Sequence, residues 1–457
     1  MTIRRPGPER LRKATAFAMC AAALCISLVA PVARAAETMN CHVGTYRLSD
    51  GGIVDIAPSD SNTLRWRRFD GTTGALTDKG GGVWTSSYGW TRRPDGKSAH
   101  FSACGAGSIN FDGLEGRRLR FDVTDTTFTS HGATLAGRLI LPQGTGIVPI
   151  VILLHGAEHD SARQFDALQR ILPAEQVGAF VFDKRGTGGS DGSYSQDFNL
   201  LADDAVAAMH EAKRLSGRRA GRIGYQAGSE GGWVAPLAAN RAHVDFVIVC
   251  FGLAVSVIDE DQQEVEIEMR EKGHSSADIA SALEVARAAE TVIASGFSEG
   301  FAQFDTVRAK YKAAPWYPDL HGNYTYALLP YSESQLRDMS AKFKWGTPFH
   351  YDPMPTLRSN TTPQLWILGG EDYEAPSAET SRRVKSLIAD DLPFTLAVYP
   401  RAEHGMTLFE AAAGSGERLS TRYAPHYFAM IRDFARYGEL RGVYGDAEIA
   451  RSKGGAR

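Results

Sequence analysis

The sequence lacks any long run of lysine or arginine, and this absence excludes a large class of functions. The formal net charge of the 457 residues is −3 at pH 7. A mildly acidic chain without basic runs has no electrostatic footprint for nucleic acid or for an anionic membrane surface. Small neutral molecules are therefore the expected partners, and we expect no nucleic-acid partner.

Metal-binding motifs and internal repeats are also missing. No His-Glu-x-x-His pattern occurs, and although His155 and His159 are four residues apart, neither a helix nor a ligand-bearing second strand accompanies them. We predict that these two histidines are loop residues beside a cleft. The sequence therefore predicts neither a metal ion nor an organic cofactor.

Positive charge is concentrated at the N-terminus, before an apolar stretch from Ala14 to Ala30. The stretch ends in an Ala-x-Ala site at Ala33–Ala35, which is typical of a secretory signal cleaved after Ala35. The alternative is an uncleaved membrane anchor. The stretch from Ala14 to Ala30 is as long as the shortest spanning helix, which needs about 17 apolar residues. Cleavage predicts an exported protein, periplasmic or secreted, without stable membrane association. Residues 1–35 carry a net charge of +5, so the formal charge of the rest is −8.

Cysteine is scarce, with five residues, of which Cys20 and Cys25 lie in the predicted signal. Cys250 lies in the apolar run 244–251 and is predicted to be a buried thiol in a core strand. Cys41 and Cys104 bracket one region of the chain, and an oxidising compartment permits them to form a disulfide. We predict this bridge.

Residues 36–118 are predicted to form a small antiparallel β domain. Four Asp-Gly pairs give hairpin-type turn signals between short strand-like runs, at positions 50–51, 70–71, 95–96 and 112–113. The runs contain several large aromatic residues: Trp66, Trp84, Trp90, Phe101 and Phe111. Aromatic residues in a small β module most often fill its core, and a ligand-binding surface is the alternative.

From Leu119 onward, apolar strands alternate with helical segments, which predicts a mostly parallel central sheet flanked by helices. A hairpin is expected over 119–142, a helix over 200–215, and a last helix over 424–437 that ends the core. More than a hundred residues separate the strands at 246–251 and 364–368, far more than one crossover needs. We therefore assign 119–253 and 361–457 to the core and 254–360 to an inserted helical cap.

One segment of the core, Ile223–Gly232, is predicted to place a nucleophile. It is an apolar strand end that turns sharply on Ser229 between glycines and continues into a helix. A serine in such a turn is forced into a strained conformation that only small neighbours permit, and its hydroxyl then projects at the carboxyl end of the sheet. An unassisted serine is a weak nucleophile, so a base and an orienting acid must accompany it.

Two later strand ends supply those partners. The strand at 363–370 ends in glycines and is followed by Asp372, although Glu371 and Glu374 flank it. The strand at 395–400 is followed by His404, which lies between Glu403 and a glycine. His404 would remove the proton of Ser229, and Asp372 would hold the imidazole in the useful tautomer.

The chain order Ser, Asp, His resembles that of the α/β-hydrolase superfamily. Two further segments resemble it as well: 148–157 resembles the strand and His-Gly turn, and 179–190 resembles the Asp-x-Arg-Gly loop. The elbow is similar to the Gly-x-Ser-Glu-Gly-Gly motif of the serine aminopeptidase-like and bacterial carboxylesterase-like branch, with Ala227 in place of the first glycine. In the family pattern the acid lies three residues after the strand-end glycine, which favours Asp372.

The resemblance implies an α/β-hydrolase fold and an oxyanion hole formed by the backbone amides of Glu230 and Ala157. The Glu230 carboxylate is then expected to be a structural partner of a neighbouring loop. We expect an exported serine hydrolase that cleaves a small carboxylic ester through an acyl-enzyme. A serine peptidase of the aminopeptidase or prolyl-peptidase type is the alternative within enzymes, and a noncatalytic binding protein is the alternative outside them. The sequence does not determine the oligomeric state.

Overall fold

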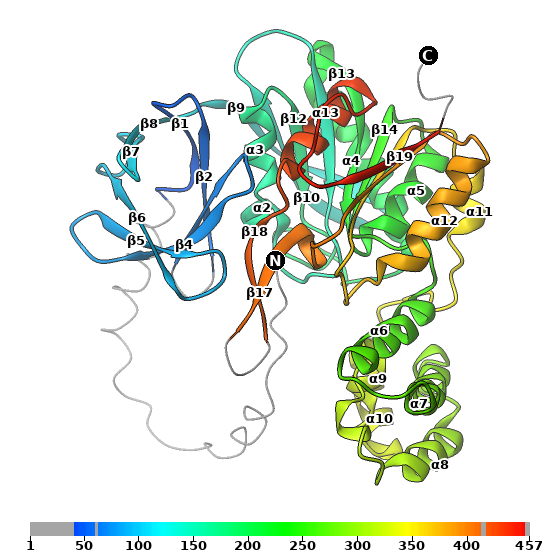
Figure 1. Cartoon of the computed structure of the whole chain (residues 1–457). Coiled ribbons are helices and arrows are strands. Elements are labelled where there is room, and N and C mark those ends of the chain that lie inside the picture. Colours follow the sequence, from blue (N-terminus) through cyan, green and yellow to red (C-terminus); the bar gives the residue numbers. More distant parts are fainter. Residues whose placement is uncertain (1–40, 60–62, 413–416, 453–457) are drawn as a thin grey trace, which may run out of the picture. The chain divides into compact units, whose positions relative to one another are not determined.

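A computed structural model describes residues 41–59, 63–412 and 417–452. The predicted signal at 1–35 lies outside the described residues. The chain divides into two compact units, one of residues up to Arg67 with Thr73–Arg118 and one of Arg68–Thr72 with Leu119–Arg457 (Figure 1). Within the described ranges, no helix combines the length and the apolar character needed to cross a bilayer.

The smaller unit is a closed antiparallel barrel, so the predicted antiparallel β domain is confirmed. Its strands are β1 (Gly44–Leu48), β2 (Ile53–Pro58), β3 (Leu64–Arg68), β4 (Thr73–Asp78), β5 (Val83–Tyr88), β6 (Pro94–Phe101), β7 (Ser108–Phe111) and β8 (Leu114–Arg118). Strand β8 pairs back with β1, which closes the barrel and leaves it without a free edge.

The interior of the barrel is aromatic. Trp66 and Phe111 pack edge to face at 5.0 Å between ring centroids, and the Trp66 indole donates a hydrogen bond to Ser86. Trp84 and Phe101 are also buried in this cluster, so four of the five aromatic residues singled out in the sequence fill the core. The predicted disulfide joins Cys41 to Cys104, whose Cα atoms are 5.5 Å apart.

The larger unit is built on a nine-stranded sheet in the order β19-β16-β15-β14-β13-β11-β12-β10-β9. The strands are β9 (Phe121–Ser130), β10 (Ala133–Pro142), β11 (Val148–Leu154), β12 (Gly178–Phe182), β13 (Ala220–Gly228), β14 (Phe246–Cys250), β15 (Gln364–Gly369), β16 (Phe394–Tyr399) and β19 (Glu448–Arg451). The six strands β11 to β16 are parallel, whereas β10 and β19 pair antiparallel with them and β9 pairs antiparallel with β10. The predicted mostly parallel sheet is therefore confirmed.

Helices cover both faces of this sheet (Figure 1). They are α2 (Ala162–Phe165), α3 (Leu168–Ala174), α4 (Phe198–Ser216), α5 (Gly231–Arg241), α12 (Ser377–Ala389) and α13 (Tyr427–Tyr437). Helices α4 and α13 both pack against β11 and β13. Because both faces are covered, β12 and β14 are apolar and fully buried.

The C-terminal part of the core differs from the prediction in three places. Helix α13 begins at Tyr427 because His426 before it adopts a left-handed backbone conformation with φ +62°. The core does not end at this helix, since β19 returns to pair with β16. A short, polar edge strand has neither the length nor the alternation that identifies a strand from sequence. A further hairpin, β17 (Thr407–Ala411) and β18 (Arg418–Tyr423), was also not predicted.

Between β14 and β15 the chain forms a helical insertion. Its helices are α6 (Val257–Glu271), α7 (Ser276–Ala294), α8 (Phe301–Tyr311), α9 (Asn323–Leu328), α10 (Glu333–Met339) and α11 (Met354–Ser359). Helices α6 and α7 each begin with a capping box, formed by Ser256 with Asp259 and by Ser275 with Asp278. The insertion has its own apolar cluster, in which Phe304 and Trp316 are buried.

Candidate active site

Ser229 follows β13 directly and precedes α5, at the carboxyl end of the parallel strands. Its φ is +50°, a left-handed conformation that residues other than glycine rarely adopt. The turn is held by two backbone hydrogen bonds, from Ser229 N to Cys250 O at 3.1 Å and from Gly232 N to Ser229 O at 2.7 Å. A Cβ atom at Gly232 would lie 2.9 Å from Gly252 Cα, so only glycine fits there without a shift.

Asp372 and His404 meet at the ends of the neighbouring strands β15 and β16. His404 Nδ1 lies 3.0 Å from Asp372 Oδ2 and 3.2 Å from Oδ1. Asp372 is 3% exposed, and its Oδ1 also accepts a hydrogen bond from the Ala375 amide at 2.8 Å. The two loops approach closely because Gly369 has no side chain, and a Cβ there would lie 2.4 Å from Ala402 O.

The carboxylates that compete with Asp372 in the sequence have other surroundings. Glu371 interacts with Arg418, at 3.2 Å, and Glu403 accepts hydrogen bonds from the hydroxyls of Thr407 and Ser420. Glu374 does reach the histidine, but at its other nitrogen, where Oε1 lies 3.9 Å from Nε2. Of these acids, Asp372 is the one whose carboxylate is hydrogen-bonded to His404.

The electrostatic surroundings of His404 favour its protonated form. Burial by itself lowers the pKa of the imidazole, but Asp372, Glu374 and the cap residue Glu260 together raise the pKa to about 10. In the free site, three carboxylates therefore favour the imidazolium form of His404.

Ser229 follows a strand of the same parallel sheet as these two residues. Within the described chain, no hydrogen bond joins the Ser229 hydroxyl to His404. The ring of Phe251, just after β14, lies edge to face on His404 at 4.8 Å between centroids. The same ring would be 2.8 Å from a Cβ at Gly228, the residue before Ser229. Phe251 therefore packs against His404 and against the residue before Ser229, and a hydrogen bond between nucleophile and base often forms well only when substrate binds.

The two amides expected to form an oxyanion hole belong to Glu230, directly after Ser229, and to Ala157, in the segment that follows β11. Among the described residues, neither the Ala157 nor the Glu230 N–H donates to another protein atom, so both are available to a ligand. The segment before Ala157 lies close to the serine, since a Cβ at Gly156 would be 3.1 Å from Ser229 Cβ. The Tyr194 hydroxyl donates to Ala157 O at 2.8 Å, which fixes the orientation of that peptide.

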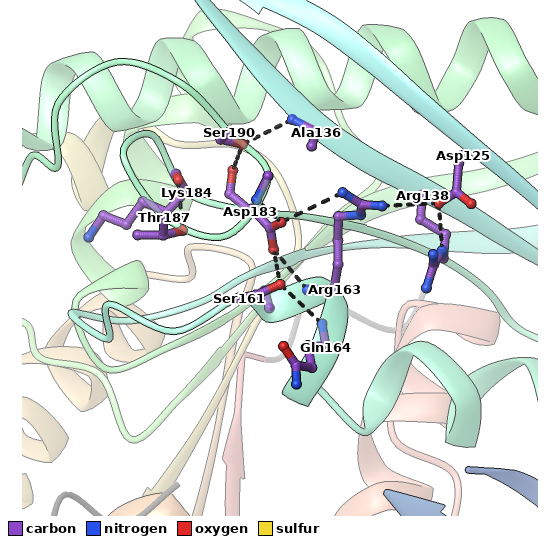
Figure 2. A network of polar contacts seen from close by, with 12 residues as sticks. Asp125, Ala136, Arg138, Ser161, Arg163, Gln164, Asp183, Lys184, Thr187 and Ser190 are labelled. Atoms are coloured by element: carbon purple, nitrogen blue, oxygen red, sulfur yellow. Dashed lines mark hydrogen bonds and ion pairs between the residues drawn. The ribbon is translucent and has the colours of Figure 1, made fainter. Parts of the chain in front are cut away.

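The loop after β12 braces this region through a dense polar network. Figure 2 shows Asp183 accepting hydrogen bonds from the Ser161 hydroxyl at 2.7 Å and the Arg163 amide at 3.0 Å. The next residue, Lys184, forms a buried ion pair with the Glu230 carboxylate. The Glu230 side chain thus has a structural partner in a neighbouring loop.

His155 and His159 make separate contacts and do not face a common point. His155 Nε2 accepts a hydrogen bond from the Lys184 amide at 3.1 Å. The His159 ring stacks on Tyr194 at 3.7 Å between centroids, and Trp345 meets Tyr194 edge to face at 5.9 Å. The rings of His159, Tyr194 and Trp345 therefore pack together, and Tyr194 connects them to the Gly156–Ala157 segment.

Four residues of the site were not identified from the sequence: Lys184, Tyr194, Phe251 and Glu260. Lys184 belongs to the loop motif at 179–190, but the motif does not indicate which residues its side chain contacts. The other three lie outside any motif, and their contacts with the site depend on chain segments far apart in sequence.

No protein-family model matches the chain, and no curated protein matches it. Among solved structures, an esterase from Pyrococcus furiosus is 17% identical, with a TM-score of 0.40 over 62% of this chain and 84% of that one. A thermophilic esterase from Thermogutta terrifontis is 20% identical, with a TM-score of 0.35 over 62% and 91%. An acylaminoacyl peptidase from Pyrococcus horikoshii is 14% identical, with a TM-score of 0.42 over 85% of this chain and 57% of that one. What this chain acts on must be argued from its own side chains.

Proposed function

We propose that this chain, whose larger unit has the α/β-hydrolase fold, is a serine hydrolase that cleaves carboxylic esters. The observation that carries the proposal is the buried Asp372–His404 pair, which lies at the same edge of the parallel sheet as the strained Ser229 turn. The strained backbone at Ser229 costs free energy of folding, and folding alone does not require it. Its position at the same sheet edge as a histidine oriented by an acid supports a catalytic role.

The proposed reaction uses His404 as a proton carrier. His404 Nε2 takes the proton of the Ser229 hydroxyl as its oxygen attacks the ester carbonyl carbon, and then gives that proton to the departing alcohol. Water attacks the resulting acyl-enzyme, and its proton passes through the same nitrogen back to Ser229. Asp372 stays ionised and holds the imidazole through Nδ1.

The negative charge that develops on the carbonyl oxygen would be held by the amides of Ala157 and Glu230. Both N–H groups lack partners among the described residues, so binding an oxyanion costs them no existing hydrogen bond. Removing one such donor in comparable enzymes costs about 3–4 kcal/mol of barrier. This pair is therefore assigned the largest share of transition-state stabilisation.

A peptidase is the second candidate, and one observation favours it. An enzyme that removes N-terminal residues needs acidic groups to hold the free amine of its substrate. Glu374 lies 3.9 Å from His404 Nε2, and Glu260 of the cap acts on the same imidazole. Amide cleavage would further require His404 to protonate a poor amine leaving group.

Export is part of the proposal. The predicted signal lies outside the described residues, and support comes from the Cys41–Cys104 disulfide, because such bonds persist in oxidising compartments. The proposed substrate is a small ester, with no nucleic-acid partner and no stable membrane association after cleavage.

The experiment is a comparison of the purified mature protein with Ser229→Ala on p-nitrophenyl acetate, p-nitrophenyl octanoate and a series of aminoacyl-p-nitroanilides. The ester proposal expects turnover of the esters that the variant loses, with the anilides untouched. Serine-dependent anilide turnover would transfer the assignment to the peptidase. Equal activity of both proteins on every substrate would refute a serine hydrolase.

A further inference from the structure

Lys184 connects the two segments that carry the proposed oxyanion hole. Its ammonium donates to Gly156 O at 3.3 Å, directly before Ala157, and forms an ion pair with the Glu230 carboxylate. The side chains of Lys184 and Glu230 are each about 5% exposed. One buried cation thus contacts both sides of the proposed hole.

One contact with an aromatic ring and one with an imidazole hold Lys184 in this position. The ammonium lies 4.7 Å from the centroid of the Tyr194 ring, over its face, which is a favourable cation–π geometry. The Tyr194 hydroxyl in turn donates to Ala157 O. The Lys184 amide donates to His155 Nε2, at the end of β11. Lys184 and Tyr194 therefore hydrogen-bond the two successive carbonyl oxygens of Gly156 and Ala157.

We propose that Lys184 is a positioning residue that sets the geometry of the oxyanion hole, by fixing the Ala157 and Glu230 amides relative to Ser229. The inference rests on the proposed function. A buried ion pair by itself is weak evidence for stability, because desolvation offsets most of the attraction between the charges. This ion pair instead connects the two loops that carry the Ala157 and Glu230 amides, and it thereby fixes the distance between these loops. Such amides stabilise an oxyanion well only when they are already in position before the reaction.

The chain offers a matched control in the next residue. Arg185 forms a buried bidentate pair with Asp204, at 2.7 and 2.6 Å, from the same loop. The Arg185 guanidinium also donates to Ser130 O at 3.4 Å, and neither partner belongs to the elbow or to the Gly156–Ala157 segment. Replacing this pair removes a buried ion pair of the same kind that makes no hydrogen bond to either segment of the proposed hole.

The test compares Lys184→Met/Glu230→Gln with Arg185→Met/Asp204→Asn and the wild type. Each double variant removes both charges, so no buried charge is left unpaired. The readouts are kcat and KM on p-nitrophenyl acetate, melting temperature, and the Ki of an alkyl trifluoromethyl ketone. That ketone accepts the Ser229 oxygen at its carbonyl carbon, the serine proton passes to His404, and the new oxyanion enters the hole.

The proposal expects the Lys184 variant to lose about 10- to 100-fold in kcat, with KM within about threefold and ketone Ki raised by a similar factor to the loss in kcat. The Arg185 variant should keep wild-type kcat and Ki, whatever its melting temperature. Wild-type kcat and Ki in the Lys184 variant would overturn the proposal and leave Lys184 as a counter-ion only. So would equal losses in both double variants, because the effect would then follow from any buried pair.

Lys184→Arg provides a second variant that keeps the buried charge, should the neutral pair fail to fold. A planar guanidinium cannot reproduce the compact ammonium geometry that reaches both Gly156 O and Glu230. We expect reduced kcat with retained folding, and unchanged kcat would contradict the proposal. Ser229→Ala is measured beside every variant. If it retains ester turnover, the proposed function itself fails and this inference with it, whereas serine-dependent turnover lets the Lys184 comparison decide alone.

Discussion

The ring of Phe251 lies edge to face on the imidazole of His404, with 4.8 Å between the two centroids. Phe251 follows a core strand and has a left-handed backbone, with φ +43°. The Phe251 ring therefore packs against one side of the proposed catalytic base. Its position is set by a left-handed backbone conformation like that of Ser229.

Phe251→Leu is expected to lower kcat by about tenfold without unfolding the protein, because a loosely held base spends less time in reacting geometry. Leucine keeps an apolar side chain but loses the flat wall against His404. Steady-state kinetics and a thermal melt check this. Unchanged kcat at an unchanged melting temperature would show that the ring does not orient the base.

Asp372→Asn should reduce kcat by roughly 10⁴-fold, since the amide stabilises the wrong histidine tautomer and cannot support the imidazolium. The measurement is single-substrate kinetics on p-nitrophenyl acetate. Glu371→Gln is the control, because its carboxylate pairs with Arg418 and does not contact His404. If Glu371→Gln costs as much as Asp372→Asn, the acid has been assigned to the wrong residue.

The pH dependence of kcat/KM follows from the acidic surroundings of His404. Its pKa is raised to about 10, and a base must be neutral to accept a proton, so kcat/KM should rise with pH across the neutral and mildly alkaline range. Removing a nearby negative charge makes the imidazolium less favourable. Glu374→Gln should therefore move the rising limb to lower pH.

This shift is measured from full pH–rate profiles of the wild type and of Glu374→Gln. Glu371→Gln again serves as the comparison, since it removes one charge from the same loop without reaching the ring. A limb that moves upward in Glu374→Gln, or stays fixed, contradicts the assigned role of Glu374.

The Cys41–Cys104 disulfide closes a loop with a sequence separation of 63 residues. The double variant Cys41→Ser/Cys104→Ser should lose about 4 kcal/mol of barrel stability, chiefly because its unfolded state gains chain entropy. Denaturant unfolding, followed by the fluorescence of the barrel tryptophans, measures the loss. An unchanged midpoint in the double variant would show that the bond adds nothing to the folded barrel.

Much of the fold and part of the site follow from local sequence. The apolar runs predict the parallel strands, because strands buried on both faces carry little else. The glycines around Ser229 predict its strained turn, since no larger residue fits beside it. The same reasoning failed at β19 and at the β17–β18 hairpin, whose short strands lack a distinctive pattern.

Only the tertiary structure decided which side chains meet. The sequence favours Asp372 over its acidic neighbours, but only the structure shows its carboxylate hydrogen-bonded to His404. Lys184 reaches Glu230 across 46 positions of sequence, and the negative charge of Glu260 in the cap raises the pKa of His404. A strained turn is determined by its own neighbours, so sequence alone predicts it. Contacts between distant segments depend on strand order and loop packing, which no local pattern encodes.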